Sequence, residues 1–282
     1  LASDLMIVKH ALTIAGSDCS GGAGIQADLK TFAAHGIYGM SAIVSVVAEN
    51  TCRVLDIQDI TPDMIEKQII AVFEDIEVHA VKIGMMSTRA GMLAVSKMLK
   101  QYRPEHVVID PVMVAKGGCA LMQEEALSTL IEEMIPLADV LTPNIPEAET
   151  ITGMRIQSEE ERKRAAVSIY QMGAKHVLIK GGHLSQEEDA TDLLYDGNSF
   201  QTFATKRIPT KNTHGTGCTF SSAIASNLAL GYAMPQAVAN AKDYVTMAIT
   251  HALEIGKGHG PTHHLYDVYQ NGLTVKENEH EL

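Results

Sequence analysis

The chain alternates short apolar runs with longer amphipathic runs from its start to about residue 180. The short runs are rich in β-branched residues, which is typical of buried strands. We expect strands at 11–15, 41–48, 80–83, 106–110, 140–142 and 176–180. Runs with apolar residues on one helical face follow these strands. We expect helices at 25–34, 62–74, 90–100, 124–134 and 159–172.

The pattern changes in the last third of the chain. Two strand-like runs, 191–195 and 199–205, flank an Asp-Gly pair at Asp196, a strong signal for a hairpin turn. Helical runs follow at about 219–229 and 235–253. Strands that alternate with helices predict a three-layer α/β/α fold. We expect a mostly parallel central sheet with a late antiparallel hairpin.

No repeat or linker divides the chain, so we expect one domain over residues 1–282. Residues 1–5 precede Met6, and we set them aside as a remnant of cloning. The last stretch, about 270–282, is polar and acidic, and we expect it to form a tail outside the fold.

Composition and charge exclude several classes of protein. Hydrophobic residues make up 46% of the 282 positions, enough for a packed core, and the net charge is −12 without a long basic run. We therefore expect no nucleic-acid partner. No apolar stretch approaches the ~20 residues of a membrane span, and no secretory signal is visible. The four cysteines lack a paired spacing. We expect reduced thiols and a cytoplasmic location.

Ligands of open parallel sheets bind beyond the carboxyl ends of the strands. The residues that directly follow the expected strands are therefore the first candidates for function. They are Gly16-Ser17-Asp18, Glu49-Asn50, Gly84-Met85, Asp110-Pro111-Val112, Pro143-Asn144 and Gly181-Gly182.

One glycine-containing turn leads into an apolar helix. In Gly215-Thr216-Gly217-Cys218 the amides could converge at a helix N-terminus, where the helix dipole favours the negative charge of a phosphoryl group. The dipole would also lower the pKa of the Cys218 thiol, which could then act as a base or orient a substrate hydroxyl. The alternative is an inert cysteine buried in a glycine-capped helix start.

Two further motifs carry polar groups suited to a magnesium–phosphate site. Asn144 and Glu147 offer oxygen ligands of the kind that hold Mg²⁺ through water. Their spacing equally fits a capping box, with Glu147 reaching back to Asn144. Lys180 stands after a buried strand and suits phosphate oxygens, although a solvated lysine is the simpler interpretation.

Two weaker patterns point to other chemistry. Residues 22–27 fit the loose dinucleotide pattern G-x-G-x-x-A, which would make the protein an oxidoreductase. The true fingerprint starts directly at the strand end, whereas six residues separate Ala15 from Gly22. Three histidines at 259–264 lie in a Gly- and Pro-containing loop without a cysteine or acid, so we expect no zinc.

Taken together, the motifs resemble a known enzyme family. They are Ala15-Gly16-Ser17-Asp18, the run from Gly21 to Asp28, Lys82-Ile83-Gly84-Met85, Asp110-Pro111-Val112-Met113, the run from Thr142 to Glu147, Lys180-Gly181-Gly182-His183, and the run from His214 to Thr219. In this order they resemble the hydroxymethylpyrimidine and phosphomethylpyrimidine kinases of thiamine biosynthesis, in the ribokinase-like superfamily. The resemblance covers residues 11–264.

The resemblance implies a homodimeric, ATP- and Mg²⁺-dependent kinase. It would phosphorylate 4-amino-5-hydroxymethyl-2-methylpyrimidine and then the monophosphate to the diphosphate. The implied pyrimidine pocket is Gly16, Asp28, Glu49, Met85, Val112 and Cys218. The implied phosphoryl-transfer and ATP site is Gly215, Thr216, Gly217, Cys218, Lys180 and Asn144, with a Mg²⁺ motif of Asn144, Glu147 and Asp110.

A pyridoxal or pyridoxine kinase of the same superfamily is the main alternative. Some such relatives carry a second cysteine in a lid, where this chain has Ala115, with Cys119 four residues later. This difference favours the pyrimidine. Members often have Gln where Glu49 stands, and a carboxylate only accepts hydrogen bonds whereas an amide also donates. A catalytically silent binder would not need the intact run from Gly215 to Cys218.

Overall fold

A computed structural model describes residues 7–181 and 189–272. Within these ranges the strands form one nine-stranded sheet in the order β3-β2-β1-β4-β5-β6-β7-β8-β9. The strands are β1 (His10–Asp18), β2 (Tyr38–Glu49), β3 (Val54–Asp59), β4 (Ala80–Ile83), β5 (Val107–Ile109), β6 (Val140–Leu141), β7 (Val177–Ile179), β8 (Asp189–Tyr195) and β9 (Phe200–Lys206). The helices are α1 (Gly24–Ala34), α2 (Pro62–Phe73), α3 (Arg89–Tyr102), α4 (Ala126–Thr129), α5 (Ile145–Thr152), α6 (Glu159–Gln171), α7 (Thr216–Ala229), α8 (Met234–Thr250) and α9 (Tyr266–Asn271).

The central strands are parallel and the two edges of the sheet are antiparallel. β8 pairs antiparallel with β7 and β9, which confirms the predicted late hairpin. β3 pairs antiparallel with β2 at the opposite edge. The sequence did not predict β3, because all of its side chains are partly or fully exposed and it lacks the apolar run of a buried strand.

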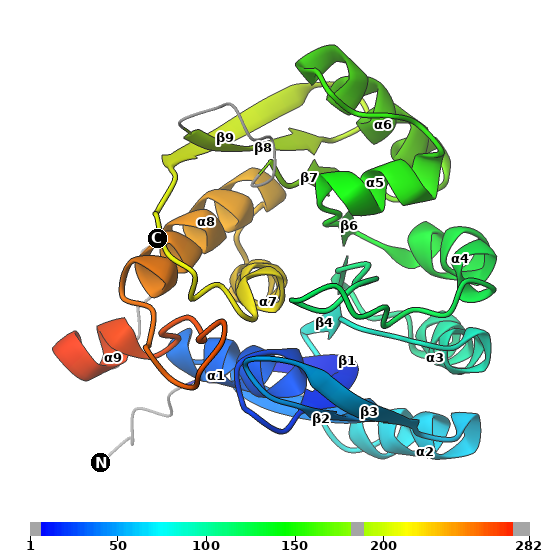
Figure 1. Ribbon diagram of the computed structural model, residues 1–282. Coiled ribbons are helices and arrows are strands. Elements are labelled where there is room, and N and C mark those ends of the chain that lie inside the picture. Colours follow the sequence, from blue (N-terminus) through cyan, green and yellow to red (C-terminus); the bar gives the residue numbers. More distant parts are fainter. Residues whose placement is uncertain (1–6, 182–188, 273–282) are drawn as a thin grey trace, which may run out of the picture.

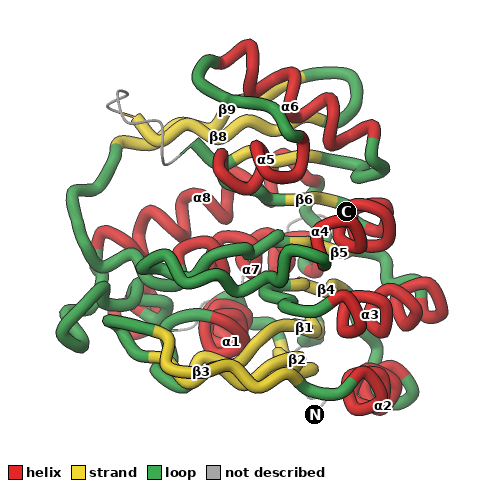
Figure 2. Tube along the Cα trace, turned by 45° about the vertical axis from the view of Figure 1, so that its right-hand side comes forward, coloured by secondary structure: helices red, strands yellow, loops and turns green. Residues whose placement is uncertain are grey.

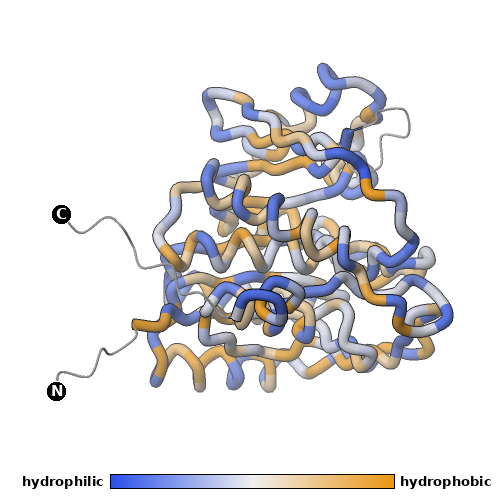
Figure 3. Tube along the Cα trace, turned by 90° about the vertical axis from the view of Figure 1, so that its left-hand side faces the viewer, coloured by the Kyte–Doolittle hydropathy of each residue, from blue (hydrophilic) through white to orange (hydrophobic). Residues whose placement is uncertain are grey.

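Alternate side chains of the inner strands face two separate cores. In β5, Val107 and Ile109 belong to one core and Val108 to the other. Helices α2, α3, α5 and α6 contribute to the first core, and α1, α7 and α8 to the second. These two groups of helices lie on opposite sides of the sheet, which confirms the α/β/α layering (Figure 1). Hydrophobic and hydrophilic stretches alternate along the helical turns, as helices covering a sheet require (Figure 3).

Two helical regions differ from the expectation. The helix expected at 124–134 is a single α-turn followed by a π-helical turn (Leu130–Met134) and a 3₁₀ turn (Ile135–Leu137). Pro136 has no N–H to continue the regular pattern of hydrogen bonds. α7 begins at Thr216, earlier than the expected residue 219, because Gly215 takes the N-cap position with φ of 79°. None of the helices in the described ranges is long and apolar enough to cross a membrane.

Candidate active site

A large cavity opens where the parallel strands end. Its volume is about 870 Å³, which is near the upper end of ordinary small-molecule sites. Loops drawn in green in Figure 2 run in front of α7, and several of them line this cavity. The lining brings together Gly16, Asp18, Glu49, Met85, Asp110, Val112, Ala115, Asn144, Glu147, Lys180, Asp192, Arg207, His214, Gly215, Thr216, Gly217, Cys218 and Lys242. The cavity has room for two small molecules that react with each other.

The N-terminus of α7 forms one wall of this cavity. Gly215 is needed at the N-cap, because its φ is 79° and an added Cβ would lie 1.8 Å from the carbonyl oxygen of Gly22. No side chain from the described part of the chain caps the helix. The N–H of Thr216 donates to the carbonyl of Thr213 at 3.2 Å. The next two amides, of Gly217 and Cys218, have no partner within the helix and are available to an anion.

A lysine and an aspartate lie directly against this helix start. Lys180 Nζ donates to Asp110 Oδ1 at 3.1 Å. A Cβ added at Gly217 would lie 3.4 Å from both Asp110 Oδ2 and Lys180 Nζ, so the absence of a side chain keeps the ion pair close to the amides. Burial alone would lower the pKa of Lys180, but the carboxylates of Asp110 and Glu147 outweigh it and raise the pKa. Lys180 therefore stays cationic.

Asn144 and Glu147 form the capping box that the sequence left as an alternative. Asn144 Oδ1 accepts from the N–H of Glu147 at 2.8 Å, and Glu147 Oε1 accepts from the N–H of Asn144 at 2.9 Å. Burial and repulsion by Asp110 raise the pKa of Glu147 to about 7, while Lys180 acts in the opposite direction. The cap uses the single side-chain oxygen of Asn144 but only one of the two oxygens of Glu147. The carboxylates of Glu147 and Asp110 are therefore the better candidates for holding a cation.

Most of the residues expected at the pyrimidine do line one end of the cavity together. Glu49, Met85, Val112, Gly16 and Cys218 all contribute to its lining. Gly16 and Met85 touch, since a Cβ at Gly16 would lie 2.8 Å from Met85 Sδ. These residues combine the apolar side chains of Met85 and Val112 with the carboxyl of Glu49 and the thiol of Cys218, as sites for small ring compounds do.

Asp28 does not line the cavity, in contrast to the expectation from the resemblance. Its side chain is fully buried, and Lys82 Nζ donates to both of its oxygens at 2.9 Å. Thr13 Oγ1 donates to Asp28 at 2.6 Å, and the hydroxyl of Ser222 donates to it as well. These partners satisfy the carboxylate behind the cavity wall. Asp28 therefore lies buried outside the cavity lining and acts on the site through its charge, which raises the pKa of Cys218.

The expected lowering of the Cys218 pKa is wrong. Burial, with further repulsion from Asp28 and Asp110, raises the pKa of the thiol to about 11. The nearby ammonium of Lys82 lowers it only in part. The helix dipole is too weak to reverse the cost of placing a thiolate in this low-dielectric position. Cys218 is therefore a neutral thiol at physiological pH.

Sequence reasoning missed a buried ion pair at the other end of the cavity. Lys242 Nζ donates to Asp192 Oδ2 at 2.7 Å and to the carbonyl of Ala190 at 2.8 Å, and Asp192 Oδ1 accepts from the N–H of Gly181. The sequence did contain one indication of this ion pair. Lys242 lies next to Ala241 on the buried face of α8, and a buried lysine requires an anionic partner. Gly182 and His183 of the expected lysine motif lie outside the described residues.

The two weaker sequence patterns do not form the sites they suggested. The N–H groups of Gly22 and Ala23 donate to Asp18 Oδ2, so these two amides are not free for a dinucleotide pyrophosphate. In the histidine-containing loop, buried His264 Nε2 bonds Thr219 Oγ1 at 2.9 Å. The expectation of no zinc at this loop remains a prediction.

Comparison with known proteins shows extensive similarity. A family model described as phosphomethylpyrimidine kinase matches residues 18–263. The hydroxymethylpyrimidine/phosphomethylpyrimidine kinase of Bacillus subtilis (strain 168) is 47% identical over 259 residues, which covers 92% of this chain and 96% of the relative.

Solved structures extend this similarity to the fold. The phosphomethylpyrimidine kinase of Clostridium difficile 630 is 50% identical with a TM-score of 0.77, and the match covers 86% of this chain and 99% of that chain. The pyridoxal kinase of Bacillus subtilis, solved as an ADP complex, is 40% identical with a TM-score of 0.86, covering 92% and 98%. This similarity confirms the ribokinase-like fold.

Proposed function

This chain belongs to the phosphomethylpyrimidine kinase family, and on that basis we propose what it catalyses. It transfers the γ-phosphoryl group of ATP to the hydroxymethyl group of 4-amino-5-hydroxymethyl-2-methylpyrimidine. It then phosphorylates the monophosphate to the diphosphate, a precursor of thiamine diphosphate. The observation that carries this proposal is the position of Lys180 and Asp110 against the free amides of Gly217 and Cys218, in one cavity with the pyrimidine end.

The phosphoryl group would be held between the amides and the lysine. The transition state of phosphoryl transfer is loose, and its charge lies mainly on the equatorial oxygens. The N–H groups of Gly217 and Cys218 and the ammonium of Lys180 would hold these oxygens, and because Lys180 lies against Gly217 little reorganisation would be needed during the reaction. Thr216 and Asn144 would contact the nucleotide phosphates at the same end of the cavity.

Magnesium fits the acidic side of the phosphate site. Glu147 and Asp110 present hard oxygen donors to the cavity, as Mg²⁺ requires, and they would hold it directly or through water. When bound, Mg²⁺ would neutralise charge on the nucleotide phosphates. Asn144 would take part through its place in the capping box and less as a direct ligand.

The pyrimidine end would place the hydroxymethyl oxygen beside Cys218. The oxygen attacks the γ-phosphorus as the bond to the β-phosphate bridging oxygen breaks, and ADP leaves. The hydroxyl proton departs late in a loose transition state and passes to an oxygen of the transferred phosphoryl group. A neutral Cys218 thiol would orient this hydroxyl by hydrogen bonding in place of acting as a resting thiolate. In the second step the nucleophile is a phosphate that is already anionic.

The experiment that tests the proposed function measures ADP release with Mg²⁺-ATP. Hydroxymethylpyrimidine, its monophosphate and pyridoxal are compared side by side. We expect turnover of both pyrimidines and slower or no turnover of pyridoxal. Turnover of pyridoxal alone would move the substrate to vitamin B6 while keeping the phosphate site.

Pyridoxal phosphorylation is the second candidate, because the similar ADP-bound structure from Bacillus subtilis is a pyridoxal kinase. The loop at 114–120 argues for the pyrimidine. Ala115 lines the cavity, whereas Cys119 is exposed and its Sγ lies near the carbonyl of Ala120. Among the described lining residues, Cys218 is therefore the one thiol available to an aldehyde.

Replacing Cys218 with alanine should harm the first phosphorylation more than the second. The alcohol of the first step loses the group that orients it, and we expect kcat to fall on the order of tenfold or more. The anionic phosphate of the second step has no proton to lose, so its kcat should change much less. Cys119→Ala is the matched control, because that thiol lies outside the cavity. Equal losses in both steps would contradict this role.

Replacing Glu147 with glutamine should weaken the response to Mg²⁺. Glutamine keeps an oxygen for the capping box but lacks the charge, and the Mg²⁺ concentration for half-maximal activity should rise on the order of 10- to 100-fold. Glu149→Gln is the control, since Glu149 lies on the same helix outside the cavity and its Oε2 accepts from Ile156 N–H. An unchanged Mg²⁺ titration would remove Glu147 from the cation site.

The assembly and the location of the protein are further proposals. We propose a homodimer in the cytoplasm that acts on small molecules, without nucleic-acid or membrane partners. All four cysteines are free, as is usual in a reducing compartment. Val46 and Leu55 are exposed apolar residues on β2 and β3, where a second copy could cover them.

A further inference from the structure

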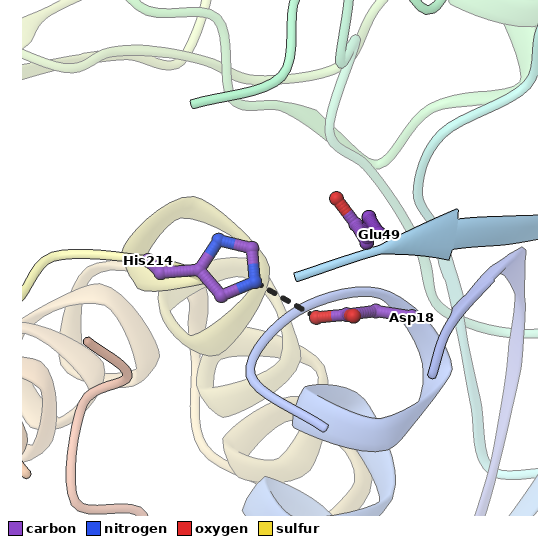
Figure 4. Close-up of side chains that lie close together, drawn as sticks. All are labelled: Asp18, Glu49 and His214. Atoms are coloured by element: carbon purple, nitrogen blue, oxygen red, sulfur yellow. Dashed lines mark hydrogen bonds and ion pairs between the residues drawn. The ribbon is translucent and has the colours of Figure 1, made fainter. Parts of the chain in front are cut away.

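Three ionisable side chains converge at the pyrimidine end of the cavity. Asp18 comes from the end of β1, Glu49 from the end of β2, and His214 from the segment before α7 (Figure 4). One ligand atom of each lies within 4.8 Å of the others. Two carboxyl groups and an imidazole at this spacing could share a metal ion or a proton. The hydrogen bonds of Asp18 decide between these two possibilities.

Asp18 has no oxygen left for a metal ion. Its Oδ1 accepts from the N–H and the hydroxyl of Ser20 at 2.8 and 2.6 Å. Its Oδ2 accepts from the N–H groups of Gly22 and Ala23 at 3.1 and 2.8 Å, and His214 Nε2 donates to it at 2.8 Å. Five donors saturate the carboxylate. A metal ion would have to break this arrangement, so the structure favours a shared proton.

The environment of Glu49 favours its neutral form. Burial, and then repulsion by Asp18, raises the pKa of Glu49 to about 7, against a lowering effect of His214. Burial would also raise the pKa of Asp18, but its hydrogen bonds with His214 and Ser20 outweigh burial and lower it to about 2. Of the two carboxyl groups, Glu49 has the higher pKa, so it is the one that carries a proton, and its O–H remains available to a ligand. Cys19 Sγ lies 3.1 Å from the Glu49 carbonyl oxygen, and Lys116 lines the same cavity.

We propose that Glu49 recognises the substrate as a neutral carboxylic acid, and that Asp18 and His214 are positioning residues that set its protonation. This inference rests on the proposed function. An aminopyrimidine presents a ring nitrogen, which accepts, beside an exocyclic amine, which donates. A carboxylic acid matches that edge with its O–H and its carbonyl oxygen, as an amide side chain would. A carboxylate would set a negative oxygen against the lone pair of the ring nitrogen.

Substrate affinity should then depend on pH in a defined direction. Below pH 7 most Glu49 side chains are protonated and bind the ring. Above pH 7 a proton must be taken up on binding, and the apparent dissociation constant should rise about tenfold for each pH unit. Glutamine always offers a donor beside an acceptor, so Glu49→Gln should bind the ring with an affinity that is independent of pH over the same range.

The decisive experiment measures proton uptake during binding. Hydroxymethylpyrimidine is titrated into the full chain without ATP at pH 8, by calorimetry in buffers of different ionisation enthalpy. The unsubstituted protein should take up roughly 0.9 proton per pyrimidine, and Glu49→Gln close to none. Equal uptake by both proteins overturns this inference alone, even if the kinase assay succeeds. Failure of both proteins to bind the pyrimidine overturns the inference and the proposed function together.

The positioning role has a separate readout. Asp18→Asn removes the charge that opposes a second carboxylate, so the break in the affinity–pH profile should move to lower pH. His214→Gln removes a group that lowers the pKa of Glu49, so the break in the affinity–pH profile should move to higher pH. If both variants lost substrate affinity but the pH at which affinity begins to fall did not move, the role of Asp18 and His214 would be merely structural. That result would overturn their proposed positioning role. If Asp18→Asn does not fold, the His214→Gln profile and the Glu49→Gln proton count decide the test.

Tight Zn²⁺ or Ni²⁺ binding that Glu49→Gln abolishes would also overturn proton sharing.

Discussion

Replacing Gly215 with alanine is expected to lower kcat for phosphoryl transfer by at least about a hundredfold. Alanine at φ of 79° is strained, and its Cβ would lie 1.8 Å from the carbonyl oxygen of Gly22. Neither backbone segment can stay in place, so the amides of Gly217 and Cys218 lose their alignment. Steady-state kinetics with saturating ATP and pyrimidine measure this loss.

Gly231 at the other end of the same helix provides a matched control. Its φ is 95°, yet an added Cβ would meet nothing within 4 Å. Gly231→Ala should therefore cost about 1 kcal/mol of stability through backbone strain, with kcat nearly unchanged. Thermal unfolding of both variants measures the loss of stability that backbone strain causes. The loss of kcat beyond that reports damage to the site. If the two variants lost the same activity, the alignment of the α7 amides would not be what Gly215 contributes.

The sequence predicted the strands whose side chains are completely buried, but not the strand whose side chains are only partly buried. β5 and β7 are buried on both faces, and their apolar runs predicted strands within a residue or two of the observed bounds. β3 exposes most of its side chains, and its short mixed sequence lacks the apolar run that signals a buried strand. The start of α7 was missed because a helical Thr216 follows a left-handed Gly215, a conformation that hydrophobic periodicity does not register.

The sequence predicted those parts of the candidate site that consist of short local motifs. Lys180, Glu147 and the turn at Gly215 are each local motifs, and the structure brings them to one cavity. The protonation states of the site residues could not be predicted from local motifs. The raised pKa of Cys218 depends on burial and on neighbouring charges, among them Asp28, that are distant in sequence. The position of Asp28 behind the cavity wall likewise depends on its pairing with distant Lys82.

Replacing Lys180 with methionine should produce the second large loss, a fall in kcat of about 10²–10³. Methionine has a similar length but no charge, so the phosphoryl oxygens lose their cation. Asp110 loses its ion-pair partner, and the pKa of Glu147 should rise further because Lys180 currently lowers it. Glu147 then becomes a poorer anion, so the Mg²⁺ requirement should rise as well. Kinetics at several Mg²⁺-ATP concentrations measure both effects.

Binding of the pyrimidine separates this role from general damage to the protein. Lys180→Met should bind hydroxymethylpyrimidine in the absence of ATP nearly as well as the unsubstituted chain, because Lys180 lies at the phosphate end of the cavity. Lys175→Met is the control, since Lys175 is exposed and pairs with Asp139 at 3.2 Å on the surface. Removing that pair should cost at most about 1 kcal/mol of stability and leave kcat unchanged. If Lys180→Met kept kcat within a few-fold, phosphoryl transfer would depend on the α7 amides and the metal ion, and Lys180 would serve mainly to neutralise Asp110 and Glu147.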